Sequence, residues 1–388
     1  MSGARVFVYV QHLLGIGHLK RAAALARALR AQGLEVTLAS GGFAVPGLEV
    51  EGVRFVQLPA AGAADLSFKV LVDEQGRAID DDWKLRRCEA LLAAWRAAQP
   101  QVLVLELFPF GRRQMRFELL PLLDTAAGAA PRPVILSSVR DVLGGQRGGE
   151  RHEETLDLVE RFFDRVLVHS DPSVIALDLT FPPTARIAGR IEYTGYIVDP
   201  AGAQSGDAGR GEVIVSAGGG AVGAPLLEAA LRARPLSALR DRSWRVLSGI
   251  NLDDRTFARL KQIAAETGGG RIVLERTRPD FTALLANCEL SISQAGYNTL
   301  METLQAGARA VVVPFARANE TEQTLRARCF AERGLLELVE EGALTPQTLA
   351  AAIDRASRKP RPVPNAVDLN GAQRSAALIA RWAKERSR

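Results

Sequence analysis

The sequence predicts an α/β protein built from two doubly wound, Rossmann-like domains that face a central cleft. Two observations predict this fold class. Short apolar strands alternate with amphipathic helices along the chain, and the same strand, glycine turn and helix open both halves. The predicted domains are residues 1–198 and residues 199–365, followed by a terminal helix within 366–388.

The first half opens with a strand over residues 6–10, a turn with Gly15 and Gly17, and a helix over 19–29. Further strands are expected over 35–39, 53–58, 101–105, 133–139 and 165–169, with helices over 83–98, 114–123 and 153–163. A long loop is expected over 60–82. The helix over 83–98 carries one apolar stripe, formed by Leu85, Cys88, Leu91, Leu92 and Trp95.

The second half repeats this order. Strands are expected over 212–216, 245–247, 271–274, 289–293 and 309–313. A glycine-rich turn over 217–223 precedes a helix over 225–233, Thr345 and Pro346 start another helix, and 373–384 is the last one. Ligands are expected at the carboxyl ends of these parallel strands.

Composition narrows the class of protein. The 388 residues carry a net charge of +5. The basic residues are spread along the chain rather than clustered, and aromatic residues are few, so nucleic-acid binding is not expected. The three cysteines fit neither a disulfide framework nor a zinc site, and no signal peptide or membrane span is recognised. We expect a cytoplasmic protein, with peripheral contact to an acidic membrane as an open alternative and an oligomeric state that the sequence does not give.

His18 is the candidate catalytic residue. It lies in the first helical turn after the first strand, where the helix N-terminus disfavours the imidazolium and keeps the ring able to accept a proton. The alternative is an ordinary surface histidine.

Two segments of the second half are candidate phosphate sites. Gly218, Gly219, Gly220 and Gly223 satisfy G-x-G-x-x-G, but no acidic residue ends the next strand, so NAD is disfavoured. Residues 293–302 predict a strand end, a turn at Gly296 and a helix from about Asn298 or Thr299, whose N–H groups attract anions. We interpret Glu302 as a side chain that accepts hydrogen bonds from two ribose hydroxyls. The alternative is an acidic residue in the first helical turn that only interacts favourably with the helix dipole.

The run from Ser293 to Gln323 resembles the donor-binding signature of glycosyltransferase family 28, which includes lipid II-forming N-acetylglucosamine transferases. The matching residues are Gly296, Thr299, Glu302, Pro314, Phe315 and Gln323. Residues 15–18 resemble the family's Gly-His loop, and also the loop of a nucleotide-sugar hydrolase of pseudaminic acid synthesis, although Arg21 falls one place later than in that loop. Residues 108–113, with Arg116 and Glu118, resemble uncharacterised predicted glycosyltransferases.

The resemblance implies the GT-B fold, with the terminal helix packed on the first domain. The expected reaction is transfer of a sugar from a nucleotide-sugar, expected to be a UDP-sugar, to an acceptor hydroxyl. It inverts the configuration at the anomeric carbon and needs neither a metal ion nor a cofactor. Nucleotide-sugar hydrolysis, C2 epimerisation and non-catalytic nucleotide-sugar binding are the alternatives. The predicted donor-side residues are Gly15, Gly17, Ser216, Gly218, Gly219, Gly220, Gln294, Gly296, Tyr297, Asn298, Thr299, Glu302, Asn319, Glu320 and Gln323. The predicted acceptor-side residues are Glu106, Arg112, Arg113, Arg140 and Asp141.

Overall fold

The computed structural model describes residues 3–13, 15–45, 48, 50–65, 70–144, 148–199, 206–219, 222–268, 270–316, 321–363 and 366–386. The chain divides into two units. Unit 1 is Met1–Ile197 with Asn370–Arg388, and unit 2 is Val198–Leu369. The sequence places the corresponding boundaries after residues 198 and 365.

Unit 1 is built on a parallel sheet with the strand order β3-β2-β1-β6-β7-β8-β9. The strands are β1 (Arg5–Val10), β2 (Glu35–Ser40), β3 (Arg54–Gln57), β6 (Val102–Glu106), β7 (Val134–Arg140), β8 (Arg165–His169) and β9 (Ile191–Tyr193). The helices are α1 (Gly17–Ala31), α2 (Asp81–Ala98), α3 (Arg116–Ala127), α4 (Gly149–Phe162) and α11 (Gly371–Arg386), with 3-10 segments at Arg113–Met115, Leu177–Leu179 and Pro182–Arg190.

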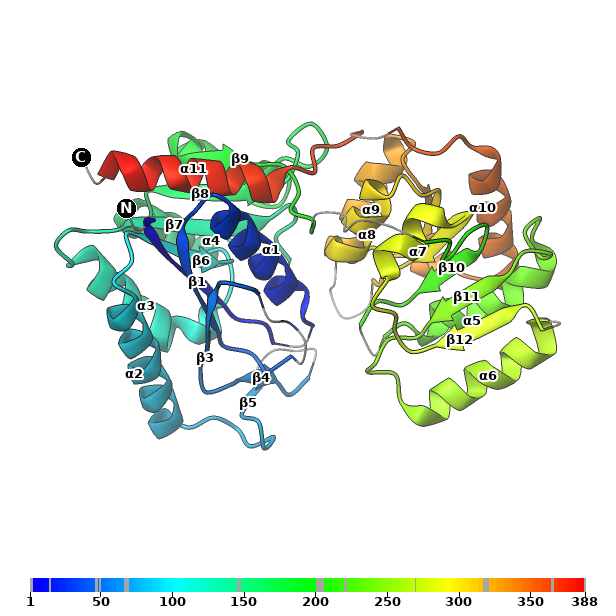
Figure 1. Cartoon of the computed structure of the whole chain (residues 1–388), viewed down its shortest axis with the longest axis horizontal. Coiled ribbons are helices and arrows are strands. Elements are labelled where there is room, and N and C mark those ends of the chain that lie inside the picture. Colours follow the sequence, from blue (N-terminus) through cyan, green and yellow to red (C-terminus); the bar gives the residue numbers. More distant parts are fainter. Residues whose placement is uncertain are drawn as a thin grey trace. The chain divides into compact units, whose positions relative to one another are not determined.

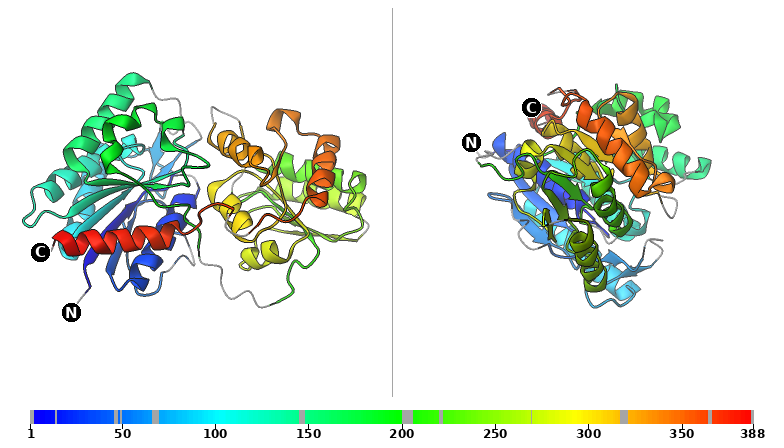
Figure 2. Two further views of the ribbon diagram at one scale, coloured as in Figure 1. Left: turned by 90° about the horizontal axis from the view of Figure 1, so that it is seen from above. Right: turned by 90° about the vertical axis from the view of Figure 1, so that its right-hand side faces the viewer.

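Helices cover both faces of this sheet because successive strand side chains point to opposite faces. Phe7 and Tyr9 of β1 pack in one core with α2, α3 and α4, whereas Val6 and Val8 pack in a second core with α1 and α11. Figure 1 shows α11 lying along α1, and the first view of Figure 2 shows the same helix against unit 1. The terminal helix therefore belongs to the core of unit 1.

Unit 2 repeats the design with the strand order β12-β11-β10-β13-β14-β15, again parallel. The strands are β10 (Val213–Ser216), β11 (Trp244–Leu247), β12 (Ile272–Glu275), β13 (Leu290–Ser293), β14 (Ala310–Val312) and β15 (Glu337–Leu338). The helices are α5 (Ala224–Ala233), α6 (Asp254–Gly268), α7 (Phe281–Asn287), α8 (Tyr297–Gln305), α9 (Glu322–Glu332) and α10 (Pro346–Arg358), with 3-10 segments at Arg234–Leu236 and Glu341–Ala343. Side chains of α5, α6 and α10 share one core with β10 and β11.

The predicted fold class is confirmed, and several local predictions are corrected. The expected loop over 60–82 contains an antiparallel pair, β4 (Gly62–Ala63) with β5 (Leu71–Val72), and Asp80 caps α2 by accepting a hydrogen bond from the Trp83 N–H. The short strands β9 and β15 were not predicted. Helix α8 begins at Tyr297, before the predicted Asn298 or Thr299, because Gly296 is already its N-cap.

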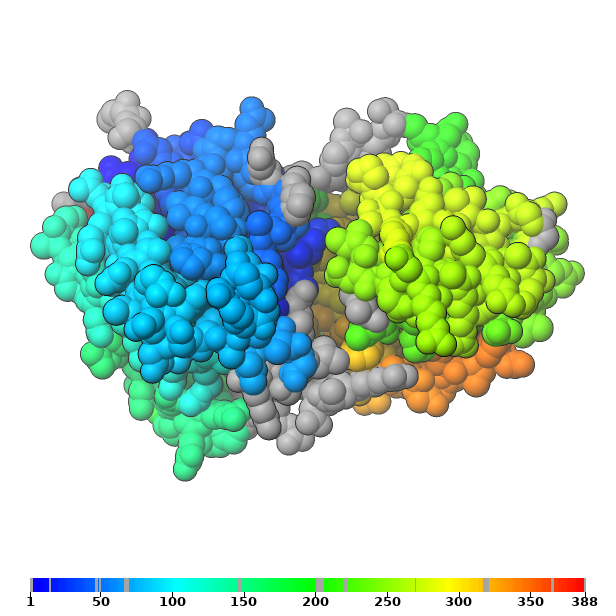
Figure 3. Space-filling model, turned by 90° about the horizontal axis from the view of Figure 1, so that it is seen from below, coloured from blue at the N-terminus to red at the C-terminus, as the bar shows by residue number. Residues whose placement is uncertain are grey.

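The outer helices are amphipathic. Figure 3 shows the solvent-facing sides of α2 and α6, which carry exposed charged residues such as Arg86, Glu89, Arg259 and Lys261.

Within the described ranges, no helix combines the length and the apolar character needed to cross a bilayer.

Candidate active site

The strand order places two loops of unit 1 side by side. β1 pairs with β2 on one side and with β6 on the other, so the chain reverses its winding direction between β1 and β6. Ligands bind at such switch points, beyond the carboxyl ends of the strands. His18, in the first turn of α1 after β1, and Glu106, the last residue of β6, both lie at this point.

His18 and Glu106 are hydrogen-bonded to each other. The distance from His18 Nδ1 to Glu106 Oε1 is 2.8 Å, and their side chains are 14% and 2% exposed. Arg21, one turn after His18 on α1, is also buried and pairs with the same carboxylate. Glu106 thus holds two side chains of one helix face and fixes the orientation of the imidazole.

Burial controls the charge of this group. Burial lowers the pKa of His18 to about 3; Glu106 opposes the shift, while Arg112 and Arg140 add to it. Burial also raises the pKa of Glu106, but His18, Arg21 and Arg112 outweigh this effect and hold that pKa below its ordinary value. The histidine is therefore neutral and the carboxylate ionised. The predicted neutrality rested on the helix N-terminus, whereas burial is the larger cause.

The contacts of His18 Nδ1 indicate the tautomer. This nitrogen lies 2.8 Å from a Glu106 carboxylate oxygen, which only accepts hydrogen bonds, and 3.2 Å from an Arg21 guanidinium nitrogen, which only donates them. The shorter contact favours the tautomer with the hydrogen on Nδ1, pointing at Glu106. The Nε2 lone pair is then the acceptor of the ring. In this tautomer, Nε2 is the ring atom that can take a proton from a hydroxyl group.

The five predicted acceptor-side residues have different surroundings. Arg112 and Arg140 act electrostatically on His18, and Arg112 Nε donates to the Gln11 carbonyl at 2.7 Å. Arg113 is half-exposed and paired with Glu154 of α4, and Asp141 is buried. The Glu106 carboxylate is buried against His18 and Arg21, and its predicted place on the acceptor side stays a prediction.

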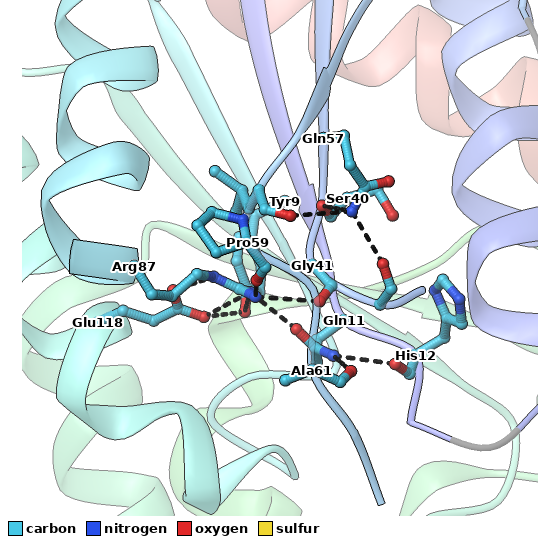
Figure 4. Close-up of polar contacts among 12 residues, drawn as sticks. Tyr9, Gln11, His12, Ser40, Gly41, Gln57, Pro59, Ala61, Arg87 and Glu118 are labelled. Carbon is cyan, nitrogen blue, oxygen red and sulfur yellow. Dashed lines mark hydrogen bonds and ion pairs between the residues drawn. The ribbon is translucent and has the colours of Figure 1, made fainter. Parts of the chain in front are cut away.

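A buried polar network that the sequence did not reveal lies beneath this edge of the sheet (Figure 4). Arg87 of α2 donates to both carboxylate oxygens of Glu118 at 2.8 and 2.9 Å, and to the side-chain oxygen of Gln11 at 2.8 Å. The Tyr9 hydroxyl also donates to Glu118, and burial raises the pKa of Tyr9. Since the Gln11 carbonyl holds Arg112, the network supports one wall of the His18 site.

In unit 2, two glycine-containing loops meet at the carboxyl ends of β10 and β11. The Gly249 N–H donates to the Arg276 carbonyl at 2.8 Å, and Asn251 donates to the Gly219 carbonyl. Among the described residues, nothing lies within 4 Å of a Cβ built on Gly218 or Gly219, whereas a Cβ on Gly223 would lie 2.1 Å from the Ala217 Cβ. The first two glycines therefore leave open space for a ligand, and Gly223 permits close packing of the turn.

The other predicted donor-side segment follows β13, the neighbour of β10. Gly296, the N-cap of α8, has no side chain that could accept the first-turn N–H groups, and the space beside it is open. Gln294, Asn298, Thr299 and Glu302 are half-buried, whereas Tyr297 and Ser216 are buried. Glu302 lies in the second turn of α8. Gly15 and Gly17 belong to unit 1, and Gly220, Asn319 and Glu320 lie outside the described residues.

Arg326, which the sequence reasoning missed, supports the α8 turn. It is fully buried, donates to the Ala295 carbonyl at 3.0 Å and to Glu322 at 2.7 Å, and lies over the Tyr297 ring. Gln323 accepts a hydrogen bond from the Phe315 N–H at 3.2 Å and so also shapes the loop after β14. The sequence signal that could have identified this role of Arg326 is the place of an arginine on the core-facing side of a helix.

Gly249 is expected to be required for the glycine turn. Its φ is +81°, and a Cβ there would lie 2.5 Å from the Gly218 carbonyl oxygen. Gly249→Ala should lower the free energy of unfolding by about 1–3 kcal/mol. Gly334→Ala is the matched control, since Gly334 has a φ of +71° with open space around it. Denaturant unfolding that gives equal free energies of unfolding for the two variants would contradict this prediction.

Comparisons of the sequence and of the structure with known proteins both find glycosyltransferases. Residues 214–380 match the glycosyltransferase family 28 C-terminal domain. The chain is 31% identical over 147 residues to the UDP-N-acetylglucosamine–N-acetylmuramyl-(pentapeptide) pyrophosphoryl-undecaprenol N-acetylglucosamine transferase of Syntrophotalea carbinolica, covering 38% of this chain and 39% of that one. The Geobacillus kaustophilus protein of the same name is 27% identical over 47% of this chain and 52% of its own length. The chain thus spans about half or less of these two relatives.

Solved structures match over nearly the whole chain. MurG of Acinetobacter baumannii superposes with a TM-score of 0.59 and 15% identity, covering 97% of this chain and 99% of that one. The glycotransferase of kitacinnamycin gives a TM-score of 0.60 and 18% identity, with coverages of 99% and 96%. At these identities the likeness concerns the fold, which is the predicted GT-B arrangement of two Rossmann-like units.

Proposed function

We propose that this protein transfers a sugar from a nucleotide-sugar to an acceptor hydroxyl, because residues 214–380 match the glycosyltransferase family 28 C-terminal domain and the whole chain has the fold of GT-B glycosyltransferases. The donor is a UDP-sugar, the reaction inverts the anomeric centre, and no metal ion takes part. The observation that carries the proposal is the neutral His18, held by Glu106 with Nε2 as its acceptor atom.

In the proposed reaction, His18 Nε2 removes the proton from the acceptor hydroxyl. The hydroxyl oxygen forms a bond to the anomeric carbon from the face opposite the leaving group, while the bond from that carbon to the diphosphate oxygen breaks. The proton remains on His18, and Glu106 stabilises the resulting imidazolium. In-line displacement of this kind inverts the configuration.

The donor is proposed to bind unit 2. The departing diphosphate gains negative charge, which the N–H groups of the Gly218–Gly219 turn and of the α8 N-terminus stabilise. Glu302 accepts hydrogen bonds from two ribose hydroxyls. A UDP-linked donor is favoured because the curated relatives are named as transferases that use UDP-N-acetylglucosamine.

The acceptor is proposed to carry negative charge. Arg112 and Arg140 both lie close enough to His18 to lower its pKa, and together they add two positive charges beside the base. Guanidinium groups bind phosphate and carboxylate groups well. An anionic acceptor would therefore bring its hydroxyl to His18.

The test is UDP release from UDP-N-acetylglucosamine, with and without an acceptor panel that includes a pyrophosphoryl-undecaprenol-linked sugar. Transfer predicts UDP release that depends on the acceptor, an inverted glycoside by NMR, and unchanged rates in a chelator. Equal UDP release without acceptor would instead identify a hydrolase, and a donor altered at C2 an epimerase. UDP binding by thermal shift with no turnover would identify a non-catalytic binder.

The pH profile tests the state of His18. The base must be neutral, and a histidine whose pKa falls from 6.5 to about 3 stays neutral through the weakly acidic range. We expect kcat/KM to show no acid limb between about pH 7 and pH 5, with donor affinity measured alongside as a control. A loss of kcat/KM with a midpoint near pH 6.5 would contradict the assignment.

A further inference from the structure

A hollow in unit 1 lies at the opposite edge of the sheet from His18. Arg5, Glu35 and Arg54 are the first residues of β1, β2 and β3, and they line a hollow of about 250 Å³ together with Arg30 at the end of α1. His18 and Glu106 lie beyond the carboxyl ends of the same parallel strands. A six-residue strand spans roughly 20 Å, so the two places are well separated.

Two of the three arginines are held by backbone carbonyls. Arg5 Nε donates to the Gln99 carbonyl at 2.8 Å, and an Arg30 terminal nitrogen donates to the Leu34 carbonyl at 2.9 Å. A guanidinium has five N–H donors, so each retains several for a ligand. Arg30 Nε is buried and, among the described residues, has no hydrogen-bond partner.

The hollow has an excess of positive charge. Among the described residues that line it, Glu35 is the single carboxylate, and the strand register places Glu35 opposite Arg5 and Thr37 opposite Arg54. Within the described part of the chain, none of the three guanidiniums comes within 4.0 Å of a carboxylate oxygen. Three arginines against one glutamate leave two uncompensated charges, which a phosphate dianion would balance.

Glu35 and Thr37 add a second kind of recognition. A carboxylate accepts hydrogen bonds from hydroxyl groups, and the threonine hydroxyl accepts or donates them. The volume also exceeds the space that one ordered water needs, about 10–15 Å³, by a wide margin. The lining therefore matches a phosphoryl group attached to a small polyol.

We propose that this amino-edge hollow is an accessory binding site for a small sugar phosphate. Its phosphoryl group binds Arg5, Arg30 and Arg54, and its hydroxyls contact Glu35 and Thr37. The site is separate from the proposed donor and acceptor sites, so it does not depend on the proposed function.

The experiment is calorimetric titration of the full chain with glucose 6-phosphate, inorganic phosphate and glucose at constant ionic strength. The wild type should bind glucose 6-phosphate more tightly than either of the other two. Arg54→Glu should weaken that binding at least about tenfold, because it reverses the charge of one of the three arginines that bind the phosphoryl group. Arg86→Glu, the same charge change at an exposed position of α2, should leave the affinity unchanged.

Three results would overturn the proposal. One is no measurable binding of glucose 6-phosphate to the wild type, and another is equal affinity in Arg54→Glu and Arg86→Glu. The third is inorganic phosphate binding as tightly as the sugar phosphate, which would remove the role of Glu35 and Thr37. Unfolding of each variant without ligand verifies that both are folded, and UDP release measured in parallel keeps this result distinct from that of the proposed transferase reaction.

Discussion

Replacing His18 with alanine is expected to lower kcat by about 10²- to 10⁴-fold, the usual contribution of a positioned general base. The alanine variant retains the glycine turn and the α8 N-terminus in unit 2, so its affinity for UDP should stay within about twofold of wild type. Initial rates of UDP release at saturating donor, together with calorimetric UDP binding, measure the two quantities separately.

Two further variants make this test specific. Glu106→Gln keeps the side-chain shape but removes the carboxylate that selects the Nδ1–H tautomer, so kcat should fall by about 10²-fold or more at unchanged UDP affinity. Lys20→Ala changes an exposed residue of the same helix and should leave the rate unchanged. Near-normal turnover in His18→Ala with UDP still bound would show that His18 is not the base.

The fold and the position of His18 could be predicted because both depend on local patterns. Alternating strands and helices give a doubly wound sheet, and a strand, a glycine turn and a helix place His18 at the carboxyl end of β1. The partner of His18 does not follow from a local pattern. Glu106 is 88 residues away in sequence and reaches His18 only because β6 is the neighbour of β1. The pairing of Glu106 with His18 was not predicted, because strand order, which no local pattern encodes, decides it.

Buried charges were the other limit of the sequence reasoning. The predicted apolar stripe of α2 includes Leu85, which is 60% exposed, and omits Arg87, which is fully buried. Arg87 lies four residues before Leu91 and eight before Trp95, so it occupies the core-facing side of the helix. A pattern of hydrophobic residues assigns such an arginine to solvent. Its burial is explained by partners that are distant in sequence, among them Glu118, Gln11 and the Gly41 carbonyl.

Arg87→Ala is expected to lower the free energy of unfolding by about 3–5 kcal/mol. Arg87 and Glu118 are both 0% exposed, so removing the arginine leaves an uncompensated buried carboxylate and unpaired groups on Gln11 and Gly41. Denaturant unfolding of the full chain, followed by a probe in unit 1, measures the change. Because Arg112 is held by the Gln11 carbonyl, turnover should also fall at temperatures where the variant is folded.

Arg186→Ala is the matched control for burial. Arg186 contacts three carboxylates, those of Glu153, Asp157 and Glu160, but it is 40% exposed. Exposed ion pairs contribute about 0–1 kcal/mol, so this variant should unfold almost like the wild type despite losing more ion pairs. The double variant Arg87→Met with Glu118→Met should be more stable than Arg87→Ala, because no buried charge is left without a partner. Equal destabilisation by Arg87→Ala and Arg186→Ala would contradict the structural role given to the buried network.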